Sequence, residues 1–158
     1  LAGHELSHQW WGNSRIAPDD RDGGAMLTET LAMFTELMLL KHMYGEPMAK
    51  ERVVMHLQIY NSEKGFSIEQ PLYRVQADQT HISYSKGAVV MWRLSKLIGE
   101  ENVNLALKHF LEKRAYPCTH KPVSMDFINE LYLVCEPSFH AHIDELFKET
   151  KEIRVEDL

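Results

Sequence analysis

The pentapeptide His4-Glu5-Leu6-Ser7-His8 brings two imidazoles and a carboxylate close together in the chain. On a helix, residues four apart lie about 40° apart around the axis, so His4 and His8 can converge on one ion. Glu5 is turned aside and can reach a water on that ion. Zinc lowers the pKa of such a water and polarises a carbonyl, and a carboxylate can take the water's proton. This HExxH pattern predicts a zinc hydrolase site, but it also arises by chance on surface helices.

A third ligand is expected on the next helix, because a catalytic zinc takes three protein ligands and keeps one position open. Glu29 is polar within the mostly apolar residues 26–33, and Glu36 follows on nearly the same line of that helix. We expect Glu29 to complete a His₂Glu site and Glu36 to hydrogen-bond a ligand histidine. The alternative is that both glutamates merely mark the solvated face of the helix.

The elements that must position these residues are helices, since apolar residues recur with helical spacing along the whole chain. Residues 14–24 read as a loop, and residues 66–83 as an extended excursion without helical period. The pattern predicts an all-α domain of six to seven helices. Their expected ranges are 1–11, 25–44, 47–62, 84–97 and 100–114, then a helix capped by Ser124 and a last one opened by Pro137.

The composition of the 158 residues is that of one ordinary globular domain, with 44% hydrophobic and 25% charged residues. A net charge of −6 argues against a nucleic-acid partner. No apolar run approaches the length of a membrane span. The two cysteines, Cys118 and Cys135, form no framework; we expect free thiols, although a single bridge is compatible with the sequence and the compartment stays open.

Three blocks of sequence together carry a family resemblance. Residues 4–13 read HELSHQWWGN, residues 27–36 read LTETLAMFTE, and residues 82–87 read ISYSKG. In this order they resemble the HELxHQWxGN motif, the second ligand helix and the Tyr-x-Lys-Gly segment of aminopeptidase-N-like zinc metallopeptidases, which are gluzincins. The resemblance implies a partial peptidase catalytic domain over residues 1–158, similar to the helical part of the thermolysin-like catalytic domain, with the zinc site in residues 1–36.

The resemblance also implies a role for each matching residue. His4, His8 and Glu29 would bind one Zn²⁺, Glu5 would be the general base, and Tyr84 would hydrogen-bond the oxyanion of the tetrahedral intermediate. The implied activity is zinc-dependent hydrolysis of peptide bonds, most simply of the aminopeptidase type. The implied partners are a peptide substrate and upstream parts of a parent protein.

The chain departs from the family pattern at several points. Twenty residues separate His8 from Glu29, slightly more than is usual, and Thr30 stands where the family has glycine. The Gly-x-Met-Glu-Asn motif, with which the family holds a substrate's amine, is absent. A zinc endopeptidase, another hydrolase on this scaffold, or a non-catalytic module of a larger assembly therefore stay open. Because His4 lies in the first turn of its helix, we expect this stretch alone to hold zinc weakly and to be inactive in isolation.

Overall fold

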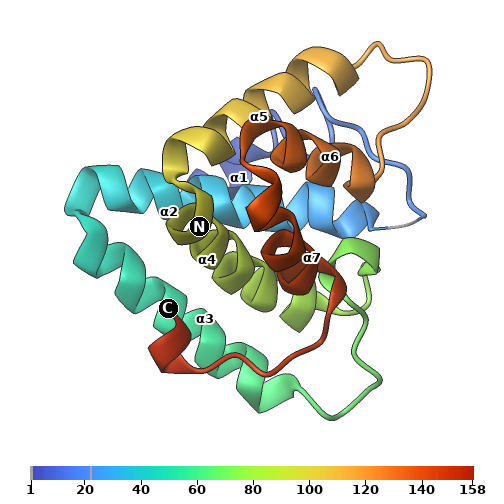
Figure 1. Cartoon of the computed structure of the whole chain (residues 1–158). Coiled ribbons are helices and arrows are strands. Elements are labelled where there is room, and N and C mark those ends of the chain that lie inside the picture. The colour runs from blue at the N-terminus through green and yellow to red at the C-terminus, as the bar shows by residue number, and fades with distance from the viewer. Residues whose placement is uncertain (1, 22) are drawn as a thin grey trace.

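The computed structural model describes residues 2–21 and 23–158, and these residues form helices with no β-strand. The seven α-helices confirm the all-α prediction (Figure 1). They are α1 (Ala2–Ser7), α2 (Leu31–Tyr44), α3 (Glu46–Glu63), α4 (Gly87–Ile98), α5 (Glu100–Arg114), α6 (Ser124–Val134) and α7 (His140–Lys148).

Five short helical segments complete the order. Two of them are π-helical, η1 (Met26–Thr30) directly before α2 and η3 (His81–Lys86) directly before α4. The other three are single 3₁₀ turns, η2 (Leu72–Arg74), η4 (Pro137–Phe139) and η5 (Val155–Asp157). π-Helical turns are rare and often lie at functional sites, and here each carries one predicted site residue.

The core lies where α2 and α4 cross and where α5, α6 and α7 cover them (Figure 1). The predicted apolar stripe of the second helix is buried as expected: Leu27, Leu31, Phe34 and Met38 are all less than a tenth exposed. A row of aromatic rings joins the covering helices. It runs from Trp11 through Phe110 and Phe127 to Phe147, with neighbouring ring centroids 5.8 to 6.5 Å apart.

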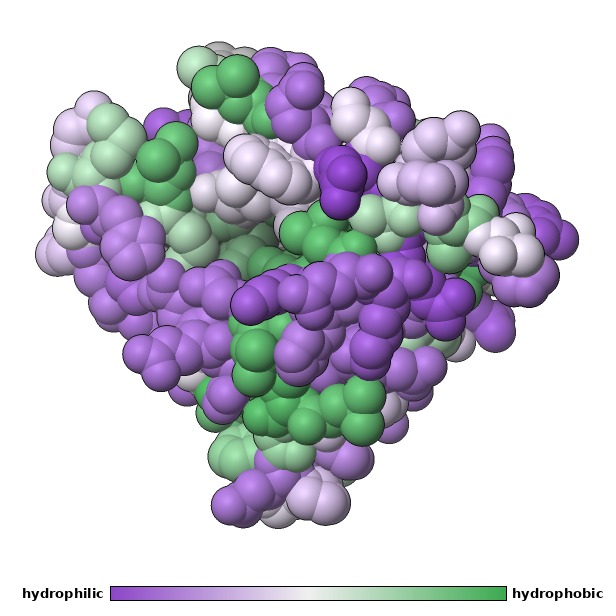
Figure 2. All heavy atoms as spheres, turned by 90° about the horizontal axis from the view of Figure 1, so that it is seen from above, coloured by the Kyte–Doolittle hydropathy of each residue, from purple (hydrophilic) through white to green (hydrophobic). Residues whose placement is uncertain are grey.

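The C-terminal tail crosses back to lie beside α3, as the red segment of Figure 1 shows. An ion pair of 3.7 Å between Lys64 and Glu152 joins the end of α3 to this tail. Ile153 of the tail is buried there. Among the described residues no helix is long and apolar enough to cross a membrane. On the face seen from above in Figure 2, hydrophilic residues cover most of the area, and hydrophobic residues form separate patches.

Several expected helix boundaries were wrong. The first helix ends at Ser7 instead of continuing to residue 11, because the amides of His8, Gln9 and Trp10 donate to carbonyls only three residues back, as in turns. The excursion ends earlier than expected, since η3 begins at His81.

Ser124 does not cap its helix; it is the first residue of α6, and its hydroxyl donates to the Tyr73 carbonyl. The Asp126 carboxylate caps instead, accepting a hydrogen bond of 2.9 Å from the Val123 amide.

Candidate metal centre

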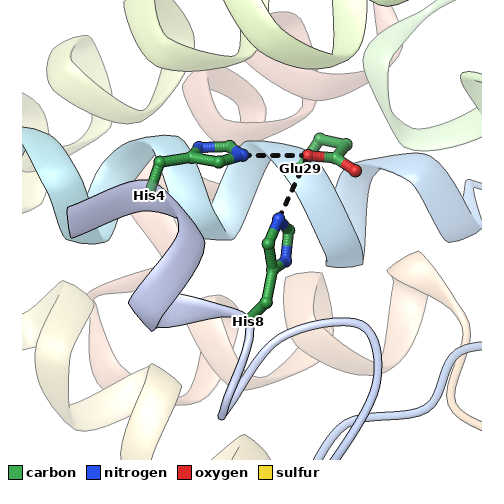
Figure 3. A group of neighbouring side chains, drawn as sticks. All are labelled: His4, His8 and Glu29. Carbon is green, nitrogen blue, oxygen red and sulfur yellow. Dashed lines mark hydrogen bonds and ion pairs between the residues drawn. The ribbon is translucent and has the colours of Figure 1, made fainter. Parts of the chain in front are cut away.

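His4 and His8 lie on one side of α1 and the turn that follows it, and both point at Glu29 on η1 (Figure 3). The Nε2 atoms of His4 and His8 are 3.1 and 3.6 Å from the same carboxylate oxygen of Glu29. One possible ligand atom from each of the three residues lies within 4.8 Å of the others. The structure therefore brings together the three residues that the sequence singled out.

The surroundings of His8 fix which of its nitrogens is free. His8 Nδ1 is 2.9 Å from the carbonyl oxygen of Trp11. A carbonyl only accepts, so Nδ1 carries the hydrogen, and in the neutral ring Nε2 keeps its lone pair toward Glu29. Trp11 is itself held, because its indole nitrogen donates to the Thr35 hydroxyl at 3.0 Å. Carbonyl partners of this kind orient the histidine ligands of metal ions.

Electrostatics keep the Glu29 carboxylate ionised. Burial alone would raise its pKa, but hydrogen bonds from His4 and Tyr84 and the charge of His8 outweigh burial, and the pKa is lowered. Two imidazole nitrogens and one carboxylate oxygen form a donor set that suits zinc. The side chains of His4, His8 and Glu29 are 7, 16 and 20% exposed, so the centre is largely shielded but reachable.

Tyr84 adjoins the same centre from η3. Its ring stacks on His4 with the centroids 5.4 Å apart. Burial raises the pKa of its hydroxyl well above the usual range, and the hydrogen bond to Glu29 and the charges of Glu29 and Glu5 raise it further. The hydroxyl therefore stays protonated at neutral pH. Glu5 itself is exposed at the surface of α1 and close enough for its charge to act on Tyr84.

A cavity of about 370 Å³ opens beside the centre. Glu29 and Tyr84 lie in its wall together with Thr28 and Ser83, and Ala25 and Ala77 contribute apolar surface. Ligand cavities of this size, lined by a few polar groups, are typical of substrate sites. The space gives a bound molecule access to the Glu29 and Tyr84 side chains.

Glu36 was also singled out by the sequence, as a partner of a ligand histidine. Glu36 is half-buried on α2, and its Cγ is 3.7 Å from the position that a Cβ on Gly3 would take, so it lies near the His4 turn. The expected bond from Glu36 to a ligand histidine is not formed, because His4 Nδ1 has no hydrogen-bond partner and His8 Nδ1 faces the Trp11 carbonyl. His81 stacks on Tyr60 with the ring centroids 6.4 Å apart and is not in the cavity wall.

Comparison with known proteins identifies the family of the chain. The peptidase family M1 domain matches residues 1–149. Human endoplasmic reticulum aminopeptidase 2 is 28% identical over 121 residues, which cover 72% of this chain and 12% of that protein. The chain thus spans a small part of that relative's length, and no solved structure matches. Because the family match covers nearly the whole chain, this protein belongs to peptidase family M1, as an aminopeptidase-N-like metallopeptidase fragment.

Proposed function

We propose that this chain carries the zinc centre of a peptidase of the aminopeptidase type. His4, His8 and Glu29 are the proposed ligands, Glu5 is the general base, and Tyr84 is the donor to the oxyanion. The observation that carries the proposal is the convergence of one ligand atom from each of the three proposed ligands within 4.8 Å, with the Tyr84 ring stacked on His4. The family membership supports it independently.

Each of the proposed catalytic residues has its own role in the reaction. A zinc ion, when bound, would polarise the substrate carbonyl and lower the pKa of a water. Glu5 accepts the proton of the attacking water and passes it to the leaving amine. Tyr84, whose hydroxyl stays protonated, donates a hydrogen bond to the carbonyl oxygen as it becomes negative. The cavity beside Glu29 receives part of the peptide.

The test is hydrolysis of an aminoacyl chromogenic amide by the complete gene product. Glu5→Gln should lower kcat by at least about 100-fold, because the amide cannot take the proton. Glu51→Gln is the matched control, since Glu51 is an exposed glutamate on α3 outside the centre. A Glu5→Gln protein with the wild-type kcat would refute the proposed role of Glu5.

A second substrate separates the alternatives. An N-acetylated peptide lacks the free amine that an aminopeptidase needs, so it should resist cleavage. Internal cleavage of that peptide would instead identify an endopeptidase. A protein that binds zinc but hydrolyses neither substrate would be a non-catalytic module.

A further inference from the structure

The two π-helical segments of the centre are joined by one buried hydrogen bond. The Thr30 hydroxyl donates to the Ser83 carbonyl at 2.6 Å, and the Thr30 side chain is fully buried. Thr30 directly follows Glu29, and Ser83 directly precedes Tyr84. This bond therefore ties the backbone beside the carboxylate to the backbone beside the phenol, across 53 positions of sequence.

The irregular backbone of η3 accounts for the availability of the Ser83 carbonyl. In an α-helix this oxygen would accept the Gly87 amide. Here the Gly87 amide donates to the carbonyls of Ile82 and Tyr84. The Ser83 carbonyl therefore does not accept its α-helical donor, and the buried Thr30 hydroxyl donates to it instead.

Gly87 provides the space in which the Thr30 side chain lies. A Cβ at position 87 would come within 2.4 Å of Oγ1, 2.8 Å of Cγ2 and 3.0 Å of Cβ of Thr30. These are the three nearest atoms, and all belong to Thr30. Any side chain at position 87 therefore collides with Thr30 before it meets anything else.

We infer that Thr30 is a positioning residue, which holds Tyr84 against Glu29 through the Ser83 carbonyl. The absence of a side chain at Gly87 leaves the space that the Thr30 side chain occupies. The inference rests on the proposed function, because positioning matters only if Tyr84 and Glu29 act together. If the Tyr84 hydroxyl is held loosely, kcat falls because the reactive geometry is reached less often, while substrate binding is affected little.

The first test compares Thr30→Val with Thr30→Ser in the complete gene product. Valine keeps the shape of threonine but removes the donor, and serine keeps the donor. Thr30→Val should lower kcat roughly tenfold with KM and zinc content within about twofold of wild type. Thr30→Ser should keep kcat within about threefold. Equal kcat values for Thr30→Val and wild type would overturn the inference, and so would equal losses in the two variants.

The second test uses thermal unfolding, so it does not depend on activity. Gly87→Ala should lower the melting temperature by roughly 4 to 8 °C, because its methyl group collides with Thr30. Adding Thr30→Gly removes the three colliding atoms, so Gly87→Ala should lower the melting temperature less in the Thr30→Gly protein than in wild type. An equal or larger loss in the Thr30→Gly protein would mean that Thr30 is not what Gly87 accommodates, and would overturn this part of the inference.

Wild type and Glu5→Gln are assayed beside these variants, so that a failure of the proposed function can be distinguished from a failure of the positioning role of Thr30. If wild type has no activity, or if Glu5→Gln retains it, the proposed function fails, and the melting comparison alone decides whether Thr30 needs Gly87. If wild type is active, Glu5→Gln is inactive and Thr30→Val equals wild type, the proposed function stands and the positioning role is refuted.

Discussion

Lys86 is a buried cation whose partner comes from the excursion before η3. Its side chain is 2% exposed, and its ammonium donates to Glu69. The Tyr60 hydroxyl also contacts the Glu69 carboxylate, at 2.8 and 2.9 Å from its two oxygens. One carboxylate thus serves two buried donors, and it links α3, the excursion and the segment that carries Tyr84.

The cost of removing this carboxylate follows from burial. Glu69→Ala leaves the Lys86 ammonium buried without a counter-charge and the Tyr60 hydroxyl without its acceptor. Breaking a buried pair in this way costs about 3 to 5 kcal/mol, and the low end applies because the Glu69 side chain is 20% exposed. For a domain of this size, about 3 kcal/mol corresponds to a melting temperature lower by roughly 6 to 12 °C. Adding Lys86→Met removes the unpaired charge and should restore most of the loss.

Thermal unfolding followed by far-ultraviolet circular dichroism measures the effect. The control is Glu112→Ala, which removes an exposed helical partner of Lys108 at 4.0 Å, with side chains 60 and 70% exposed. That variant should change the stability by less than about 0.5 kcal/mol. If Glu69→Ala were no more destabilising than Glu112→Ala, the buried pair would not stabilise the fold. A double variant with no recovery would show that the unpaired charge is not the cause.

Gly12→Ala should lower the melting temperature by several degrees and reduce zinc affinity, because φ is +105° and the added Cβ would lie 2.4 Å from Cγ2 of Thr28, beside Glu29. Unfolding and zinc titration check this, and wild-type values for both would contradict it. The pKa of Glu100 is lowered, chiefly by its hydrogen bond with Lys41 and also by His42, against burial. The ionised Glu100 carboxylate therefore stabilises the fold at pH values above its pKa in the unfolded chain. This stabilisation is lost as the pH falls through its pKa in the folded protein. Glu100→Gln should be about 1 kcal/mol less stable at pH 7 in urea unfolding, and this difference should disappear once the pH is below the folded pKa of Glu100; a difference that does not shrink on acidification would contradict the prediction.

The residues of the metal centre could be predicted from the sequence because the patterns that indicate them lie within short stretches of the chain. Four-residue spacing on one helix makes His4 and His8 converge whatever the rest of the chain does. Glu29 stood out as a polar residue in an apolar stretch, and the structure places its carboxylate beside both imidazoles. The helix at 100–114 was also predicted with its observed bounds, since Gly99 precedes it and its apolar stripe is regular.

The contacts that hold the centre could not be predicted, because they join distant parts of the chain. Helical periodicity does not distinguish an α-helical turn from a π-helical one, so η1 was read as part of one continuous helix. The bond from Thr30 to Ser83 depends on that irregular backbone. Thr30 was noted only as a departure from the family's glycine, and the matching space at Gly87 appears only when α4 and η1 are packed together.

The Tyr84 position shows how much a resemblance adds. Without the family, Tyr84 would be an ordinary aromatic near a helix start. The structure stacks its ring on His4 and turns its hydroxyl toward Glu29, so the motif selected a residue that periodicity alone would have left in the core.

Zinc content tests the central claim most directly. Elemental analysis of the complete gene product, after zinc loading and dialysis, should be made for wild type, Glu5→Gln and Glu29→Ala. We predict one zinc per chain in wild type and in Glu5→Gln, and loss of zinc in Glu29→Ala, because Glu29 supplies the only carboxylate among the three converging residues. Equal zinc in Glu29→Ala and wild type, or none in wild type, would contradict the assignment of this centre.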